Sequence, residues 1–345
     1  MKIIHIIAGV SEDSDKAHVA ALIAALAAPD REQIVVAEAD HPALTLPPKT
    51  GGPITPIVLT PSLIWRQRWR LAKLIRREKP EVVCCWSPDV LRFLPRVKIP
   101  KIIWYGVPRD NVPLYPDAHY VAATEAIRQY LLRSGVPPDQ AHFIPQPPAL
   151  TPAPPIDRAT VATPRQAKVI LSLSRLHPHK GLDLLLQAAA TMPDCYVWLA
   201  GEGPARPELE RLAIKLGIAD RVRFLSRRAD RAALLRAADV SVVPSRHEAS
   251  DAAFVETWEA GVPLVACRNA LSSVSIADGL NGLLVPCNDP EALAAALRRA
   301  FTDRDLRQKL IAQGYATYIK TYTSEAVLRE WASLINLYHC PAGLR

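Results

Sequence analysis

Residues 168–190 read KVILSLSRLHPHKGLDLLLQAAA, which is an apolar run, a cationic turn and an apolar helical pattern in succession. An apolar run of this kind is typical of a parallel strand that is covered on both faces. The turn carries Arg175 and Lys180 just before the helical pattern begins. A phosphate bound there would meet both side-chain charge and the free amides of a helix start. The stretch therefore predicts an α/β fold with an anion site at a strand-to-helix turn.

The same alternation of short Ile- and Val-rich runs with helical patterns continues through both halves of the 345-residue chain, a length that suits two domains. We expect a Rossmann-like domain over residues 1–150 and a second one over 167–322. Prolines cluster between them, so residues 151–166 are predicted to be a linker. Residues 323–345 hold a final helical pattern, and periodicity leaves open whether it packs back on the first domain. The predicted fold is α/β, with two doubly wound domains facing each other across a cleft.

Two carboxylates, Glu248 and Glu256, are eight positions apart across a predicted strand end, turn and helix start. Carboxylates accept hydrogen bonds from sugar hydroxyls, and cations such as Arg175 and Lys180 hold a diphosphate. Both segments follow predicted strands, where doubly wound sheets bind their ligands. The combination indicates a nucleotide-sugar site. The alternative is that these four side chains are solvated turn and helix charges.

Composition narrows the class of protein without choosing a function. The chain is 49% hydrophobic and 22% charged, which is ordinary for a globular protein, and its net charge of +8 favours anionic partners. Six cysteines are scattered without a C-x-x-C pair, so we expect reduced thiols. No signal peptide or membrane span is apparent. We expect a cytoplasmic protein, or one held peripherally on the inner face of the cell membrane.

Several motifs of the second half resemble those of the group 1 glycosyltransferases, the large retaining family (family 4 type) with the two-Rossmann GT-B fold. The matching strings are SRLHPHKG, LAGEGPARPELERLA, LGIADRVRFL, LLRAADVSVVPSRHE, EAGVPLVA, DGLNGLLVP and DPEALAAAL. The resemblance extends over about residues 168–300. The first half matches more weakly, through its alternation and the run DAHYVAATEAIRQYLLRSGVPPDQAHFIP. The resemblance implies that residues 1–150 form the acceptor-side domain.

The resemblance also implies roles for particular residues. Arg175 and Lys180 would hold the donor diphosphate and stabilise its charge as it leaves. Glu256 would accept hydrogen bonds from the ribose, and Glu248 would contact the donor sugar. The base would meet the chain between Leu225 and Arg228. The backbone amides of Ala249, Ser250 and Asp251 would lie beside the sugar and the phosphates.

Neither a metal nor a cofactor is expected, because retaining members of this family use the cations above and no protein nucleophile. The implied reaction is a sugar transfer from a nucleoside diphosphate to an acceptor, such as a lipid-linked or cell-envelope saccharide. Asp13-Ser-Asp15 has the D-x-D spacing of a metal motif, but it follows the first strand, so we interpret it as a solvated loop or a helix cap.

The chain departs from the family pattern in three places. Ala249-Ser250-Asp251 stands where glycines usually follow the first glutamate, and Asp251 would act as a helix N-cap that repels a phosphate. Only Gly9 stands in the first loop, and Asn269-Ala-Leu-Ser-Ser273 replaces a Gly-Gly-x-Pro-Glu run. Two alternative functions therefore stay open. One is a nucleotide-sugar epimerase or hydrolase of the same fold, and the other is a catalytically inactive binding protein; no nucleic-acid motif is present.

The segment 63–77 is a basic helical pattern with Trp65 and Trp69 one turn apart. We interpret it as a core helix whose outer face is solvated by Arg and Lys. The alternative is an anchor to an anionic membrane surface, with indoles at the interface and cations on lipid headgroups.

Overall fold

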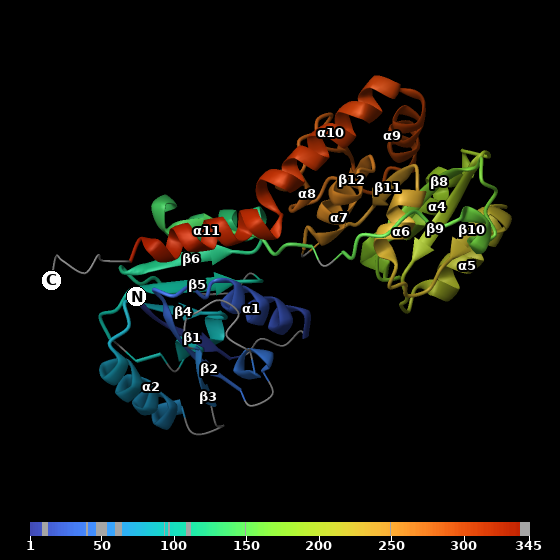
Figure 1. Ribbon diagram of the computed structural model, residues 1–345. Helices are drawn as coiled ribbons and strands as arrows, with labels where there is room; N and C mark the ends of the chain where they lie inside the picture. Colours follow the sequence, from blue (N-terminus) through green and yellow to red (C-terminus); the bar gives the residue numbers. More distant parts are fainter. Residues whose placement is uncertain are drawn as a thin grey trace. The chain divides into compact units, whose positions relative to one another are not determined.

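The computed structural model describes residues 1–8, 13–38, 41–45, 54–58, 64–92, 94–95, 97–107, 112–148, 150–248 and 250–338. Its contacts divide the chain into two compact units, one made of Met1–Gln146 with Ser324–Arg345 and the other of Pro147–Thr323. Each unit is built on its own parallel sheet (Figure 1). The predicted α/β fold with two Rossmann-like domains is confirmed.

The first unit has a seven-stranded sheet in the order β3-β2-β1-β4-β5-β6-β7. The strands are β1 (Lys2–Ile7), β2 (Glu32–Ala37), β3 (Ile54–Val58), β4 (Val82–Cys85), β5 (Lys101–Tyr105), β6 (Ala118–Ala122) and β7 (Ala141–Phe143). Its helices are α1 (Asp13–Ala25), α2 (Ile64–Glu78), α3 (Glu125–Arg133) and α11 (Ser324–Asn336). Short 3-10 turns lie at Pro42–Thr45, Pro88–Arg92 and Pro138–Gln140.

Helices cover both faces of this sheet. In β1, Ile3 and Ile7 pack with α1 and α11, whereas Ile4 and Ile6 pack on the opposite face with α2 and α3. Because each face is buried, successive positions of the strand must be apolar. This explains the run KIIHII, which period-two alternation would not produce.

The last helix, α11, belongs to the first unit although it directly follows a helix of the second (Figure 1). Its Trp331 is buried against Trp86, with ring centroids 4.8 Å apart. The indole N–H of Trp86 donates to His5 Nδ1 at 3.1 Å, and the other ring nitrogen of His5 pairs with Gln33 at 2.9 Å. Burial lowers the pKa of His5 to about 4, so the imidazole is neutral and the network is uncharged.

The second unit has a six-stranded sheet in the order β10-β9-β8-β11-β12-β13. The strands are β8 (Lys168–Leu173), β9 (Cys195–Ala200), β10 (Val222–Phe224), β11 (Val240–Val243), β12 (Leu264–Cys267) and β13 (Leu283–Val285). Its helices are α4 (Leu182–Ala190), α5 (Arg206–Lys215), α6 (Arg231–Ala237), α7 (Ala252–Ala260), α8 (Ser272–Ser275), α9 (Pro290–Thr302) and α10 (Arg304–Thr321). Short 3-10 turns lie at Arg158–Val161, Pro178–Lys180 and Ala219–Arg221.

The proline-rich segment 151–166, which was predicted to be a linker, packs on the second unit. Val161 is buried in the same cluster as Leu234 and Leu235 of α6, and Ile156 packs against it. The Arg158 guanidinium donates to Ala237 O at 2.9 Å and pairs with Asp239 at 3.0 Å. Proline excludes helix and central strand but not extended packing along a surface, so the segment becomes part of the second unit.

Two further predictions concern thiols and membrane spans. Cys84, Cys85, Cys195 and Cys267 are buried free thiols and Cys287 is a partly exposed one, while Cys340 lies outside the described residues. Within the described ranges, no helix combines the length and the hydropathy that crossing a membrane requires.

Candidate functional site

The predicted donor-site residues lie around the point where the second sheet reverses its strand order. β8 and β11 are adjacent and parallel, with Val240 paired with Ile170 and Ser241 with Leu171. The chain then continues to β9 on one side and to β12 on the other. Ligands of doubly wound sheets bind outside the carboxyl ends of the strands at such a point. The loops that leave these two strands carry Arg175 and Lys180 on one side and Glu248 on the other.

Glycines let these loops approach each other closely. Gly181 has a φ of +65°, and a Cβ there would lie 2.0 Å from the carbonyl oxygen of Pro244. Gly203 has a φ of +157°, and its Cβ would lie 2.3 Å from Leu176 O. Only glycine tolerates both the left-handed backbone and the missing space. The β8 loop is thereby held against the β11 loop and the β9 loop.

Lys180 and Glu248 form an ion pair that links the two loops. Lys180 Nζ donates to Glu248 Oε2 at 2.6 Å, and the side chains are only 14% and 8% exposed. Ser245, which is buried, donates to the other carboxylate oxygen at 2.5 Å. Both oxygens of Glu248 are therefore oriented by side chains that follow β8 and β11.

Arg175 and His179 complete this cluster. Partial desolvation lowers the pKa of His179, the charges of His177, Lys180 and Arg175 lower it further, and Glu248 opposes them. All four groups therefore lie within electrostatic range of one imidazole. Arg175 is exposed, and within the described part of the chain its guanidinium is in no ion pair. Its charge is therefore available to a ligand.

Arg246 fastens the cationic turn, a role that sequence reasoning missed. Its guanidinium is bidentate to Asp183 of α4 at 2.9 and 2.8 Å and donates to Pro178 O at 2.9 Å. Its backbone N–H donates to His179 O at 2.9 Å. In the sequence Arg246 is visible only as the arginine of the SRHE string. Nothing in that string indicates that its side chain contacts a turn some seventy positions upstream.

Glu256 lies in α7 and pairs with a different cation. Its side chain is 6% exposed, and Arg231 of α6 donates to it at 2.5 Å. Burial raises the pKa of Glu256 to about 7, although the neighbouring Arg231, itself 42% exposed, acts in the opposite direction. The carboxyl is thus poised to titrate near neutral pH. Arg231 was not foreseen, because nothing in its local sequence distinguishes it from other helix-start arginines.

The start of α7 differs from what was predicted for Asp251. Asp251 stands at the N-cap, but its side chain makes no capping hydrogen bond. It is buried instead and accepts a hydrogen bond from the Tyr322 hydroxyl at 2.9 Å, while burial raises its pKa to about 6. The predicted repulsion of a phosphate at this helix is correspondingly reduced, since the carboxyl faces Tyr322. Ser250 caps the helix by accepting from Ala252 N at 3.2 Å, and Ala249 lies outside the described residues.

Leu225 and Arg228, predicted to meet the base, follow β10. Leu225 is half-buried, and its N–H donates to Leu199 O at 2.9 Å. Arg228 is bidentate to Asp230 at 2.8 and 2.6 Å, so its guanidinium is engaged within its own loop. Their contact with a base stays a prediction.

Residues 269–273, which depart from the family pattern, begin with a hydrogen-bonded turn at Asn269. Asn269 Oδ1 accepts from the backbone N–H groups of Leu271 and Ser272, and its Nδ2 donates to Ser245 O at 2.9 Å. Asn269 therefore supports the residue that orients Glu248. Gly9, the other departure, lies outside the described residues.

Two observations bear on the extent of the site. A cavity of about 690 Å³ lies beside the cationic turn, between α4 and α5, and His177, His179 and Arg246 are among its lining residues. The side chains of Arg175, Lys180, Glu248 and Glu256 are not among its described lining residues.

A metal site is the other feature that the sequence raised. In the described ranges, no three His, Cys, Asp or Glu side chains gather as metal ligands, and Asp13 and Asp15 lie in the first turn of α1.

Two doubly wound parallel sheets define a Rossmann-type protein, and the loops at the switch point of the second sheet carry cations and a carboxylate. The sequence model of the family "Glycosyl transferases group 1" matches residues 155–317. The lipopolysaccharide core biosynthesis glycosyltransferase LpsE of Rhizobium meliloti (strain 1021) is 30% identical over 268 residues, which are 77% of this chain and 78% of LpsE. The chain belongs to the group 1 glycosyltransferases.

Solved structures agree on the GT-B fold over almost the whole chain. A glycosyltransferase from Rickettsia africae ESF-5 superposes with a TM-score of 0.75 at 16% identity, covering 98% of both chains. Anabaena Alr3699/HepE, solved in complex with UDP, superposes with a TM-score of 0.72 at 17% identity and covers 98% of this chain and 100% of its own. The fold expected from the motifs is thereby confirmed.

Proposed function

We propose that this enzyme transfers a sugar from a nucleoside diphosphate donor to a saccharide of the cell envelope, with retention and without a metal. The observation that carries the proposal is the Lys180–Glu248 pair at the switch point, beside the free charge of Arg175. The envelope acceptor rests on the likeness to LpsE, named for lipopolysaccharide core biosynthesis. The nucleotide donor is supported by the related HepE fold, which was solved with UDP.

In this proposal the two cations act on the leaving group. As the bond between the anomeric carbon and the diphosphate breaks, charge accumulates on the phosphate oxygens, and Arg175 and Lys180 stabilise it without rearrangement. The acceptor hydroxyl attacks from the face that the diphosphate leaves and passes its proton to a departing phosphate oxygen. No protein nucleophile is required.

The carboxylates position the donor. Glu248, whose two oxygens are oriented by Lys180 and Ser245, accepts hydrogen bonds from the sugar hydroxyls. Glu256 in its ionised form accepts from the ribose hydroxyls, and Arg231 supports that charge. The amides at the start of α7 add their positive dipole end beside the phosphates.

Calorimetric titration with UDP-, GDP- and ADP-sugars, followed by turnover with a saccharide acceptor, tests the proposal. Lys180→Ala and Glu256→Gln should each lower turnover at least about 100-fold while the protein stays folded. Lys320→Ala, which removes an exposed cation of α10, is the matched control. Full activity in either site variant would refute its assigned role. Donor consumption without acceptor would indicate a hydrolase or epimerase, and a chain that binds none of the donors would be an inactive relative.

We further propose that α2 lies on an anionic membrane surface. The helix buries Leu71 and Ile75, as expected of a core helix, but Trp65 and Trp69 are 62% and 61% exposed on its outer face. Exposed indoles beside a row of arginines suit the headgroup layer of a bilayer. Flotation with anionic liposomes should be lost when the arginines 66, 68, 70, 76 and 77 are all changed to glutamate. Equal flotation of that variant and the unchanged protein would refute the anchor.

A further inference from the structure

The two halves of α2 contact the rest of the first unit very differently. Leu71 and Ile75 are buried against the sheet, and both lie in the second half of the helix. The first turns are exposed on nearly all sides, including Ile64, Trp65 and Trp69. Among the described residues, the fully buried side chains of α2 therefore all lie in its second half.

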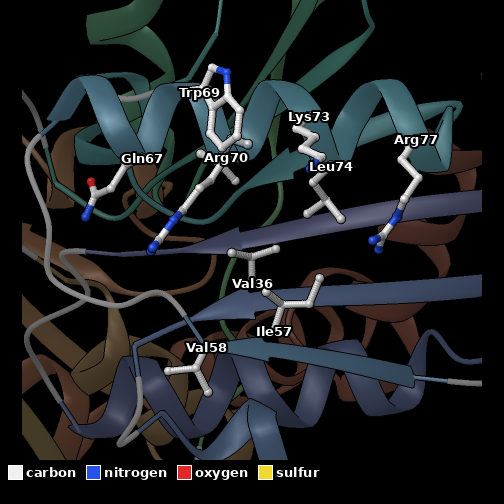
Figure 2. A pocket seen from close by; sticks show the side chains of 10 residues that line it. Val36, Ile57, Val58, Gln67, Trp69, Arg70, Lys73, Leu74 and Arg77 are labelled. Atoms are coloured by element: carbon white, nitrogen blue, oxygen red, sulfur yellow. The ribbon is translucent and has the colours of Figure 1, made fainter.

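A cavity of about 360 Å³ lies beneath this helix (Figure 2). Its floor consists of Val36 of β2 with Ile57 and Val58 of β3, and Leu74 of α2 points toward Val36 and Ile57 from above. Trp69 is also among the lining residues, although its indole extends over the helix, away from the strands (Figure 2). The volume lies in the range of small-ligand sites, and the lining is suited to hydrocarbon.

Cations border this apolar cavity. Arg70, Lys73 and Arg77 belong to the lining, and the Arg70 and Arg77 side chains extend toward the sheet on either side of Leu74 (Figure 2). Lys73 Nζ lies 5.5 Å from the Trp69 ring centroid, and Arg77 is partly neutralised by Glu78 at 2.6 Å. Among the described lining residues there is no carboxylate. The cavity therefore suits an apolar chain that carries an anionic group.

We propose that this cavity binds one acyl chain of an anionic phospholipid, with the phosphate near Arg70 and Lys73. The proposal rests on the membrane association proposed above for α2 and adds a defined lipid site to it. A soluble polyanion would contact the cations but leave the hydrocarbon lining unfilled. An apolar peptide would fill the lining but place no negative charge beside the cations. An anionic lipid does both.

The test uses the full chain and myristoyl lysophosphatidylglycerol below its micelle concentration, so that binding of one lipid is measured without a bilayer. Ile57→Trp should fill the cavity and weaken binding at least about tenfold. Val58→Trp, at a half-exposed position of the same lining, should also weaken lipid binding. It serves as the test variant if Ile57→Trp does not fold. Trp65→Ala, which removes an exposed indole that does not line the cavity, should change the affinity less than about twofold.

Two ligand controls separate the contribution of the lipid headgroup to the affinity from that of the acyl chain. Myristoyl lysophosphatidylcholine should bind at least about tenfold more weakly because its headgroup has no net negative charge, and glycerophosphate should bind more weakly still. Unchanged lipid affinity in both tryptophan-filled variants would overturn the proposal, as would equal binding of the two lipids or of glycerophosphate. UDP titration of the same variants reports on the second unit, so failure of the lipid site is distinguished from failure of the donor site. Liposome flotation reports separately on the anchor.

Discussion

At the scale of single residues, the candidate site contains buried carboxyl groups with raised pKa values. Glu256 lies in the middle of α7 and Asp251 at its N-cap, and burial raises their pKa values to about 7 and about 6. In both cases desolvation of the charged form outweighs a stabilising partner, which is Arg231 for Glu256 and Tyr322 for Asp251. Carboxyl groups with raised pKa values are concentrated at functional sites.

Donor binding should therefore depend on pH through Glu256. In the proposed function the ionised carboxylate accepts hydrogen bonds from the ribose hydroxyls, so the affinity for UDP should fall as the pH decreases below about 7, by up to about tenfold per pH unit. Calorimetry between about pH 6 and about pH 8 measures this, and Glu256→Gln should remove that component of the slope. If the unchanged protein and the variant have parallel profiles, Glu256 does not bind the ribose in the way proposed.

The same pKa shift affects stability with a definite sign. Between pH 4.5 and about 7 the folded state binds more protons at Glu256 than the unfolded state does, since its pKa rises from 4.5. The contribution of this group to the free energy of unfolding should therefore decrease as the pH rises through that interval.

At the scale of elements, the site depends on two loops that follow adjacent strands. Gly181 permits the β8 loop to lie against Pro244 O, and Arg246 joins the same turn to α4 through Asp183. Lys180 and Glu248 can meet only while this arrangement holds. Arg246 is thus a positioning residue for the ion pair.

Arg246→Ala should release the turn that carries Lys180. We expect turnover to fall more than donor affinity, because Lys180 acts on the leaving group in the proposed function and its misplacement would affect the reaction step most. The free energy of unfolding should decrease by about 1 kcal/mol, since the lost contacts are partly exposed. Steady-state kinetics and urea denaturation measure the two effects. Arg211→Ala on α5 is the control, and identical kinetics for the two variants would contradict the positioning role.

At the scale of the whole molecule, the first unit requires a helix from the end of the chain. Trp331 of α11 packs on Trp86, whose indole is tied to the buried His5 and Gln33 network. The first sheet therefore gains part of the cover on one face from residues more than 300 positions after its first strand.

Trp331→Ala should destabilise the first unit by about 3–5 kcal/mol, because it leaves a large cavity beside Trp86. Urea denaturation followed by tryptophan fluorescence measures the loss, and UDP binding to the second unit serves as a separate readout. Leu337→Ala, at a position that is 62% exposed, should have little effect. A similar small effect for Trp331→Ala would contradict the role of α11.

The sequence by itself determined the fold class and the family. Doubly buried strands leave apolar runs such as KIIHII and KVILSL, and the spacing of Lys180, Glu248 and Glu256 marks the family. These signals are local, because burial on both faces constrains neighbouring positions directly.

Only the tertiary structure decided which of these residues have partners and what those partners are. Strand order brings Lys180 within 2.6 Å of Glu248, which lies 68 positions later, and it lets the Arg246 guanidinium bind the Asp183 carboxylate. It also leaves Trp65 and Trp69 outside the core and packs the predicted linker on α6. Periodicity reports which positions of a segment are apolar, but it carries no information on which distant segment covers them.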